Sequence, residues 1–234
     1  AIDRPGQVCY TEPITDLLHI KEVITDDKRH PVHLDGTLWD STRQILPAWN
    51  AVLRRRNTGR QLTHAEIRGY MGKTVEEIAA LMLPEKTPQE AVDIAKECCR
   101  EELGWLLHSG GTLYADLVPV LEQLRNQYAL CIVSNCQNGY IETFLHVHRL
   151  KPYFCDFECS GNTGRCKGEN IAAVMKRRQI RSAFYLGDTE GDQQAAGLAK
   201  IPFVHAAYGF GKAIGKVPRI TALKELPALA EKLL

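Results

Sequence analysis

The sequence lacks long apolar segments and an excess of charge of either sign. Its longest apolar runs, such as residues 129–133, are strand-sized, far below the roughly 18 residues of a membrane-spanning helix. Its 29 Lys and Arg residues nearly balance 28 Asp and Glu residues, and no block of like charge occurs. These absences argue against a membrane or nucleic-acid partner. The first residues also lack the apolar stretch of a signal peptide, so we expect a soluble, cytoplasmic protein.

The sequence also lacks cysteines at metal-binding spacings. Among eight cysteines, the nearest to a cluster are Cys155, Cys159 and Cys166, but their spacings match no common zinc site and no histidine completes a set. We therefore expect reduced, mostly buried thiols. Cys131, for example, falls within an apolar strand pattern, where cysteine behaves as a small hydrophobe.

Strand-like and helix-like segments alternate after Tyr128. The strand-like segments are 129–134, 154–158, 182–186 and 202–206, and the helix-like ones lie near 139–148, 168–178 and 192–200. This alternation predicts an α/β fold, a Rossmann-like parallel sheet with crossover helices. Such sheets bind ligands at the carboxyl ends of their strands, so we expect the functional side chains there.

Residues 44–111 have a purely helical pattern. Three capping boxes mark helix starts, at Thr63, Thr74 and Thr87, each followed three residues later by glutamate. This pattern predicts an all-helical segment inserted into the α/β core. The expected division is an atypical N-terminal segment (1–31), a core (32–43 and 112–234) and a helical insert (44–111), which the family resemblance described next implies is a cap domain.

Four motifs in the core resemble the signatures of the haloacid dehalogenase (HAD) superfamily. Residues 33–41 read His-Leu-Asp-Gly-Thr-Leu-Trp-Asp-Ser, against a family form of Asp-x-Asp-Gly-Thr-Leu-x-Asp-Ser. Ser134-Asn135, Lys167 and the acidic stretch 187–192 follow in family order, each at the expected element. The stretch to Gly211 is similar to the phosphoglycolate-phosphatase-like branch. The resemblance implies a Mg²⁺-dependent phosphatase of small phosphorylated metabolites.

The resemblance also implies catalytic roles. Position 33 is the family's nucleophile and a metal ligand, and here it is His33. Asp35 matches the general acid and base, whose backbone carbonyl also ligates the metal. Lys167 matches the lysine that neutralises charge at the phosphoryl group. Its place at a helix start opposes the helix dipole, which independently favours an anion nearby.

The remaining site residues are implied by the same motifs. Ser134 and Asn135 would hold phosphate oxygens at the end of a strand, where the following helix adds a positive dipole end. Asp188 is the expected direct ligand of Mg²⁺, and Asp192 would ligate it directly or through water, since hard oxygen ligands suit this ion.

Two cationic residues of the cap complete the candidate site. Arg68 and Lys73 flank a Gly-Tyr-Met-Gly stretch at 69–72, and by resemblance a cation here meets the substrate. A solvated polar face would account for them equally well. In the first motif, Thr37 and Asp40 are expected to stabilise the loop.

His33 leaves the function open between two hypotheses. It removes a carboxylate ligand and the aspartyl-phosphate chemistry, a loss that typically costs about 10⁴–10⁶ in rate. The chain is therefore either an impaired phosphatase or a non-catalytic phospho-ligand-binding or regulatory protein. Dehalogenation is a weaker third reading, because it too needs an aspartate nucleophile.

The segment before the first motif departs from the family. A central strand should be a continuous apolar run, but residues 27–32 read Asp-Lys-Arg-His-Pro-Val, which is poor material for one. Residues 13–24 instead predict a short amphipathic helix. Either a natural lineage has lost its catalytic strand, or a reading-frame or gene-model change altered the N-terminus. The abrupt return to the family pattern at Leu34 favours the second.

Overall fold

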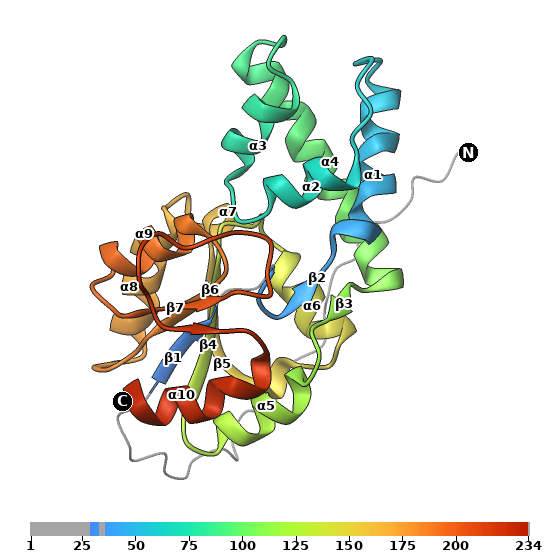
Figure 1. The fold of residues 1–234 in the computed structure, drawn as a ribbon. Coiled ribbons are helices and arrows are strands. Elements are labelled where there is room, and N and C mark those ends of the chain that lie inside the picture. The colour runs from blue at the N-terminus through green and yellow to red at the C-terminus, as the bar shows by residue number, and fades with distance from the viewer. Residues whose placement is uncertain (1–28, 33–35, 234) are drawn as a thin grey trace.

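The core is built around a parallel sheet. The computed structural model describes residues 29–32 and 36–233, and its six-stranded sheet has the order β5-β4-β1-β6-β7-β8 with every pair parallel (Figure 1). The strands are β1 (Arg29–Val32), β4 (Ala129–Ser134), β5 (Phe154–Cys159), β6 (Tyr185–Gly187), β7 (Phe203–Ala206) and β8 (Arg219–Ile220). The predicted Rossmann-like α/β fold is confirmed. The expected helix over 13–24 lies outside the described residues.

Strand β1 corrects the expectation that its segment is unsuited to the centre of the sheet. It pairs with β4 along its whole length, from Arg29 opposite Ala129 to Val32 opposite Ile132. Against β6 it pairs only at Val32. A proline removes a single backbone donor, and the short ladder on the β6 side leaves few hydrogen bonds to lose. The sequence-based expectation was wrong because backbone pairing with β4 forms the strand although its residues are unfavourable for a central strand.

Helices cover both faces of the sheet. Alternate residues of β4 divide between two apolar clusters: Leu130 and Ile132 belong to one, Cys131 and Val133 to the other. The helices beside the first cluster are α5 (Leu117–Arg125), α6 (Tyr140–Val147) and α10 (Leu226–Leu233), and those beside the second are α8 (Lys167–Arg177) and α9 (Glu190–Leu198). Short turns α7 (Ser160–Thr163), η1 (Lys151–Tyr153) and η2 (Leu223–Glu225) connect them. Among the described residues, no helix has the length and apolarity to cross a membrane.

The inserted cap is helical, as predicted. It consists of α1 (Thr42–Arg55), α2 (His64–Tyr70), α3 (Val75–Met82) and α4 (Pro88–Ser109), and Figure 1 shows it standing at one end of the core. All three predicted capping boxes form, at Thr63, Thr74 and Thr87. Two short antiparallel strands, β2 (Trp39–Asp40) and β3 (Thr112–Leu113), pair where the chain enters and leaves the insert.

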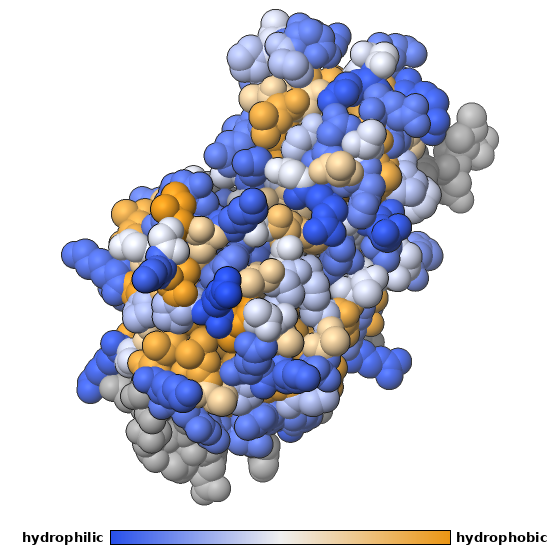
Figure 2. All heavy atoms as spheres, in the orientation of Figure 1, coloured by the Kyte–Doolittle hydropathy of each residue, from blue (hydrophilic) through white to orange (hydrophobic). Residues whose placement is uncertain are grey.

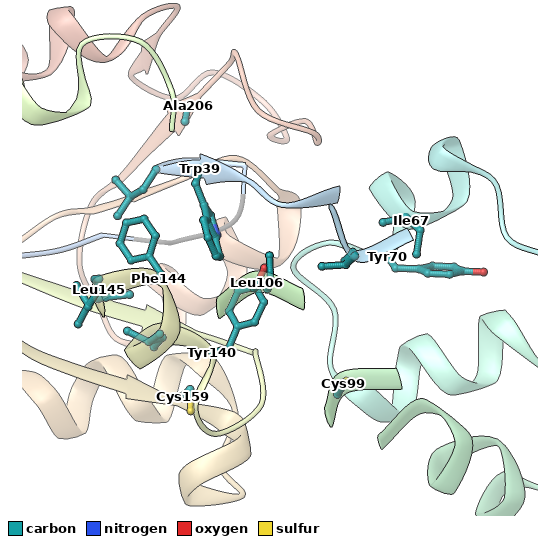
Figure 3. Close-up of a cluster of buried hydrophobic side chains, with 14 of the residues drawn as sticks. Trp39, Ile67, Tyr70, Cys99, Leu106, Tyr140, Phe144, Leu145, Cys159 and Ala206 are labelled. Atoms are coloured by element: carbon teal, nitrogen blue, oxygen red, sulfur yellow. The ribbon is translucent and has the colours of Figure 1, made fainter. Parts of the chain in front are cut away.

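An aromatic cluster packs under this entry point. The Trp39 ring, fully buried, lies 5.0 Å from that of Phe144 and 5.5 Å from that of Tyr140, both edge-on, as Figure 3 shows. Ser41 Oγ and the Tyr140 hydroxyl are hydrogen-bonded at 2.7 Å. A Cβ at Gly111 would lie 2.6 Å from the Trp39 ring. Glycine at 111 is therefore required by the close approach of the returning chain to this cluster.

Candidate active site

Three loops meet at the carboxylate of Asp188. This residue follows β6 and is fully buried. Its Oδ2 accepts a hydrogen bond from the backbone N–H of Phe210 at 2.8 Å. A Cβ at Gly36 would lie 2.3 Å from Asp188 Oδ2, and one at Gly209 would lie 2.4 Å from the Gly36 carbonyl oxygen. Glycines at both positions let the first-motif loop and the loop after β7 close around the carboxylate.

Lys167 and Asp192 form a buried ion pair next to the backbone of Asp188. Lys167 Nζ donates to Asp192 Oδ1 at 2.6 Å, and the two side chains are 3% and 0% exposed. Asp192 Oδ2 accepts from the backbone N–H groups of Asp188 and Thr189 and from the Thr189 hydroxyl. Both oxygens of Asp192 are thus engaged by the protein. This geometry favours a role in positioning Lys167 and capping α9 over the direct metal ligation suggested by the sequence.

The loop after β4 joins the core to the cap. Ser134, 2% exposed, ends the strand, and its Oγ accepts from the Cys136 N–H at 3.3 Å. The side chain of Asn135 donates to the Gly72 carbonyl of the cap at 2.9 Å and accepts from the Ser160 hydroxyl at 3.0 Å. The amide of Asn135 is therefore committed to a bridge between the two parts. The Ser134 hydroxyl and the loop's backbone amides are the groups suited to phosphate.

A cleft of about 670 Å³ separates the cap from the core and opens on these loops. Figure 2 shows the cap as a smaller lobe that stands on the core. Arg68 and Lys73 both line the cleft from the cap, and Lys167 lines it from the core. The guanidinium of Arg68 lies 4.7 Å above the Phe210 ring. Lys73 makes no ion pair with any described carboxylate, so of the two cap cations it is the better placed to meet an anion.

The first-motif loop is described from Gly36 onward. His33 and Asp35 lie outside the described residues. Thr37 is fully buried, and its carbonyl accepts from the Tyr208 hydroxyl at 2.9 Å. Asp40 Oδ1 accepts from the Thr42 N–H at 2.9 Å. The Asp40 side chain therefore stabilises the loop, and Thr37 contributes through its backbone carbonyl.

The donor set suits a hard cation such as Mg²⁺ in part. Within the part of the chain whose side chains the structure describes, residues 36–233, no group of three His, Cys, Asp or Glu side chains is arranged to hold a metal. Asp188 contributes a buried carboxylate against the Gly36 loop, and Thr37 Oγ1 is a buried oxygen without a hydrogen-bond partner among these residues. Such oxygens are typical of Mg²⁺ surroundings. Further ligands would have to come from positions 33–35, the part of the loop that the family motif assigns to the metal.

Two residues of the site were not predicted from the sequence. Phe210 supplies the N–H to Asp188 and carries Arg68 on its ring, and Lys212 adds a core cation to the cleft. The glycines on both sides of Phe210 were the available signal, because they indicate a loop that approaches other backbone closely. Nothing in the sequence pattern marks Lys212.

Comparison with known proteins identifies the family. A family model described as haloacid dehalogenase-like hydrolase matches residues 33–206, well over half of the chain. The chain belongs to this family. The match spans the first-motif loop, the insert, Ser134, Lys167 and Asp188.

Individual relatives agree with this assignment. A phosphoglycolate phosphatase from Rhodobacter capsulatus is 28% identical over 208 residues, covering 84% of this chain and 92% of the relative. A haloacid dehalogenase-like family hydrolase from Streptococcus pneumoniae superposes with a TM-score of 0.72 at 22% identity, covering 86% of this chain and 97% of the other. CbbY from Rhodobacter sphaeroides, solved in complex with phosphate, gives 0.73 at 16% identity, covering 86% and 96%. Because their sequence identities to this chain are low, the two structures establish that the fold is shared and nothing beyond it.

Proposed function

We propose that this protein is a phosphatase of small phosphorylated metabolites whose turnover is limited by His33. The observation that carries the proposal is the buried Lys167–Asp192 pair next to Asp188. Lys167 lines the cleft between cap and core, and Ser134 lines an adjoining small hollow that shares Lys73 and Asn135 with that cleft. A buried cation held by a single carboxylate at the carboxyl edge of a parallel sheet is suited to an incoming phosphoryl group.

The residues divide the work of phosphoryl transfer between binding and proton movement. The Ser134 hydroxyl and nearby backbone amides bind phosphoryl oxygens, and the Lys167 ammonium neutralises their charge. Asp192 holds Lys167 in place. Asp35 manages the proton on the leaving oxygen. Mg²⁺, when bound near Asp188, supplies further charge neutralisation.

The cap contributes selection and exclusion of water. We propose that residues 44–111 form a unit that moves on the β2–β3 connection. Lys73 and Arg68 meet the part of the substrate beyond the phosphate. A narrow hollow of about 40 Å³ is lined by Ser134, Trp49 and Tyr140. Its small volume favours a substrate with a small leaving group.

His33 favours the binding of phosphate over its transfer. Imidazole replaces both a metal ligand and the carboxylate that would form the covalent intermediate. The groups that bind phosphate do not depend on it. A non-catalytic phospho-ligand-binding or regulatory role is therefore the second candidate, and it predicts binding without hydrolysis.

Calorimetry with inorganic phosphate and turnover assays on a panel of phosphomonoesters test the proposal together. Ser134→Ala and Lys167→Met should each weaken phosphate binding by about tenfold or more, as expected for a charge-assisted hydrogen bond worth about 1.5–3 kcal/mol. Lys176→Met, which removes an exposed lysine of the same helix α8, is the matched control and should leave binding unchanged. Equal effects of Lys167→Met and Lys176→Met would refute the placement of the phosphate site.

A further inference from the structure

Two cysteines lie side by side on neighbouring strands, away from the cleft. Cys131 of β4 and Cys155 of β5 have their Sγ atoms 3.4 Å apart. The strand register shifts at this point: Leu130 pairs with Phe154, but Cys131 pairs with Asp156. Cys155 is therefore the extra residue of a bulge. The bulge brings its thiol against that of Cys131.

The two thiols have very different surroundings. Cys155 is exposed and Cys131 is fully buried. The hydrogen bond with Cys155, together with burial, raises the pKa of the Cys131 thiol, so Cys131 remains protonated. Arg178 lies beside Cys155 and donates to its carbonyl oxygen at 2.5 Å. The same guanidinium is ion-paired with Asp156 at 2.7 Å. Solvent exposure makes Cys155 the thiol that an oxidant reaches first, and its thiolate form is the nucleophile in cysteine oxidation.

We propose that Cys155 and Cys131 form a reversible oxidation site, with Cys155 reacting first and Cys131 resolving. Redox-sensitive cysteines are solvent-accessible and often lie next to a second, resolving thiol, and this pair has both features. The proposal does not depend on the phosphatase assignment.

The oxidant is a hydroperoxide such as hydrogen peroxide. The Cys155 thiolate attacks one peroxide oxygen, the O–O bond breaks, and hydroxide leaves, which forms a sulfenic acid on Cys155. Cys131 Sγ then attacks Cys155 Sγ; an S–S bond forms, the S–O bond breaks, and water leaves with the Cys131 proton. The hydroxide takes up the proton released when Cys155 ionised. Two thiols are oxidised to one disulfide and one peroxide is reduced to two waters.

The required movement is small. The sulfur atoms must approach from 3.4 Å to about 2.05 Å. Cys155 lies in a bulge, so its backbone can shift without breaking a regular ladder. Because the bulge can move Cys155 toward Cys131, Cys131 can stay close to its buried position.

Mass spectrometry of the whole chain tests the proposal. The reduced protein is treated with hydrogen peroxide, its remaining thiols are alkylated, and a proteolytic digest is searched for linked peptides. We expect a cross-link between the segments carrying Cys131 and Cys155, lighter by two hydrogen atoms and reversed by dithiothreitol. Cys136 and Cys159 lie on the same segments, so the variant Cys136→Ser must retain the link.

Variants at the pair give the decisive comparison. Cys155→Ser should abolish the link. Cys131→Ser should leave Cys155 as a sulfenic acid that dimedone traps. Cys166→Ser, which removes another exposed cysteine, is the matched control and should not alter the yield. A link that persists in Cys155→Ser, or no link while Cys166 is oxidised in the same sample, would overturn the proposal.

Discussion

The buried pair Lys167–Asp192 offers the sharpest test of the site's energetics. Replacing Asp192 by asparagine keeps the side-chain volume and one oxygen for the cap of α9, but leaves the Lys167 ammonium, 3% exposed, without its counter-charge. Breaking a buried ion pair from one side costs about 3–5 kcal/mol. We expect Asp192→Asn to lower the free energy of unfolding by that amount in urea titrations monitored by circular dichroism.

A double-mutant cycle separates the ion pair from the cap. Lys167→Met removes the cation, so in the Lys167→Met background Asp192→Asn should cost about 2 kcal/mol less than in the native protein. Glu101→Gln, which breaks an exposed ion pair with Arg55, is the matched control and should have no measurable effect. An equal cost of Asp192→Asn in both backgrounds would refute the coupling and leave capping as the whole role of Asp192.

Two further predictions concern the joint between cap and core. Gly111→Ala should destabilise the protein by about 1–3 kcal/mol, because the new Cβ would press on the buried Trp39 ring. Gly104→Ala, in an open helix position, should stabilise it slightly. A larger loss of stability in Gly104→Ala than in Gly111→Ala would contradict the packing. Burial lowers the pKa of His148 in the folded protein. As the pH falls, the imidazole is therefore protonated in the unfolded chain before it is protonated in the folded protein. Stability should therefore fall as pH drops through about 6.5, and a pH titration of unfolding should lose this component in His148→Phe; an unchanged profile would refute it.

Elements with local signals could be predicted from the sequence. The apolar run of β4 gave its full range, 129–134, and the three capping boxes marked the helix starts of the insert because they depend on residues three positions apart. Ser134 ends β4 and Asp188 follows β6, as expected for polar residues at the carboxyl edge of a parallel sheet.

Features set by contacts distant in the chain could not be predicted. Strand β1 forms despite Pro31 because β4 supplies its ladder. The engagement of Asp192 Oδ1 depends on Lys167, 25 residues away. Phe210 meets Asp188 only through the loop after β7. In each case the deciding partner comes from another element, and neither periodicity nor spacing encodes it.

The central claim is that a complete phosphate site is limited by the side chain at position 33. The direct measurement is the rate of phosphate release from small phosphomonoesters, with and without Mg²⁺, for the native protein and for His33→Asp. Restoring the carboxylate should raise the Mg²⁺-dependent rate by orders of magnitude, since loss of a covalent nucleophile typically costs about 10⁴–10⁶. Substantial turnover by the native protein that survives His33→Ala would contradict the account and require a different nucleophile.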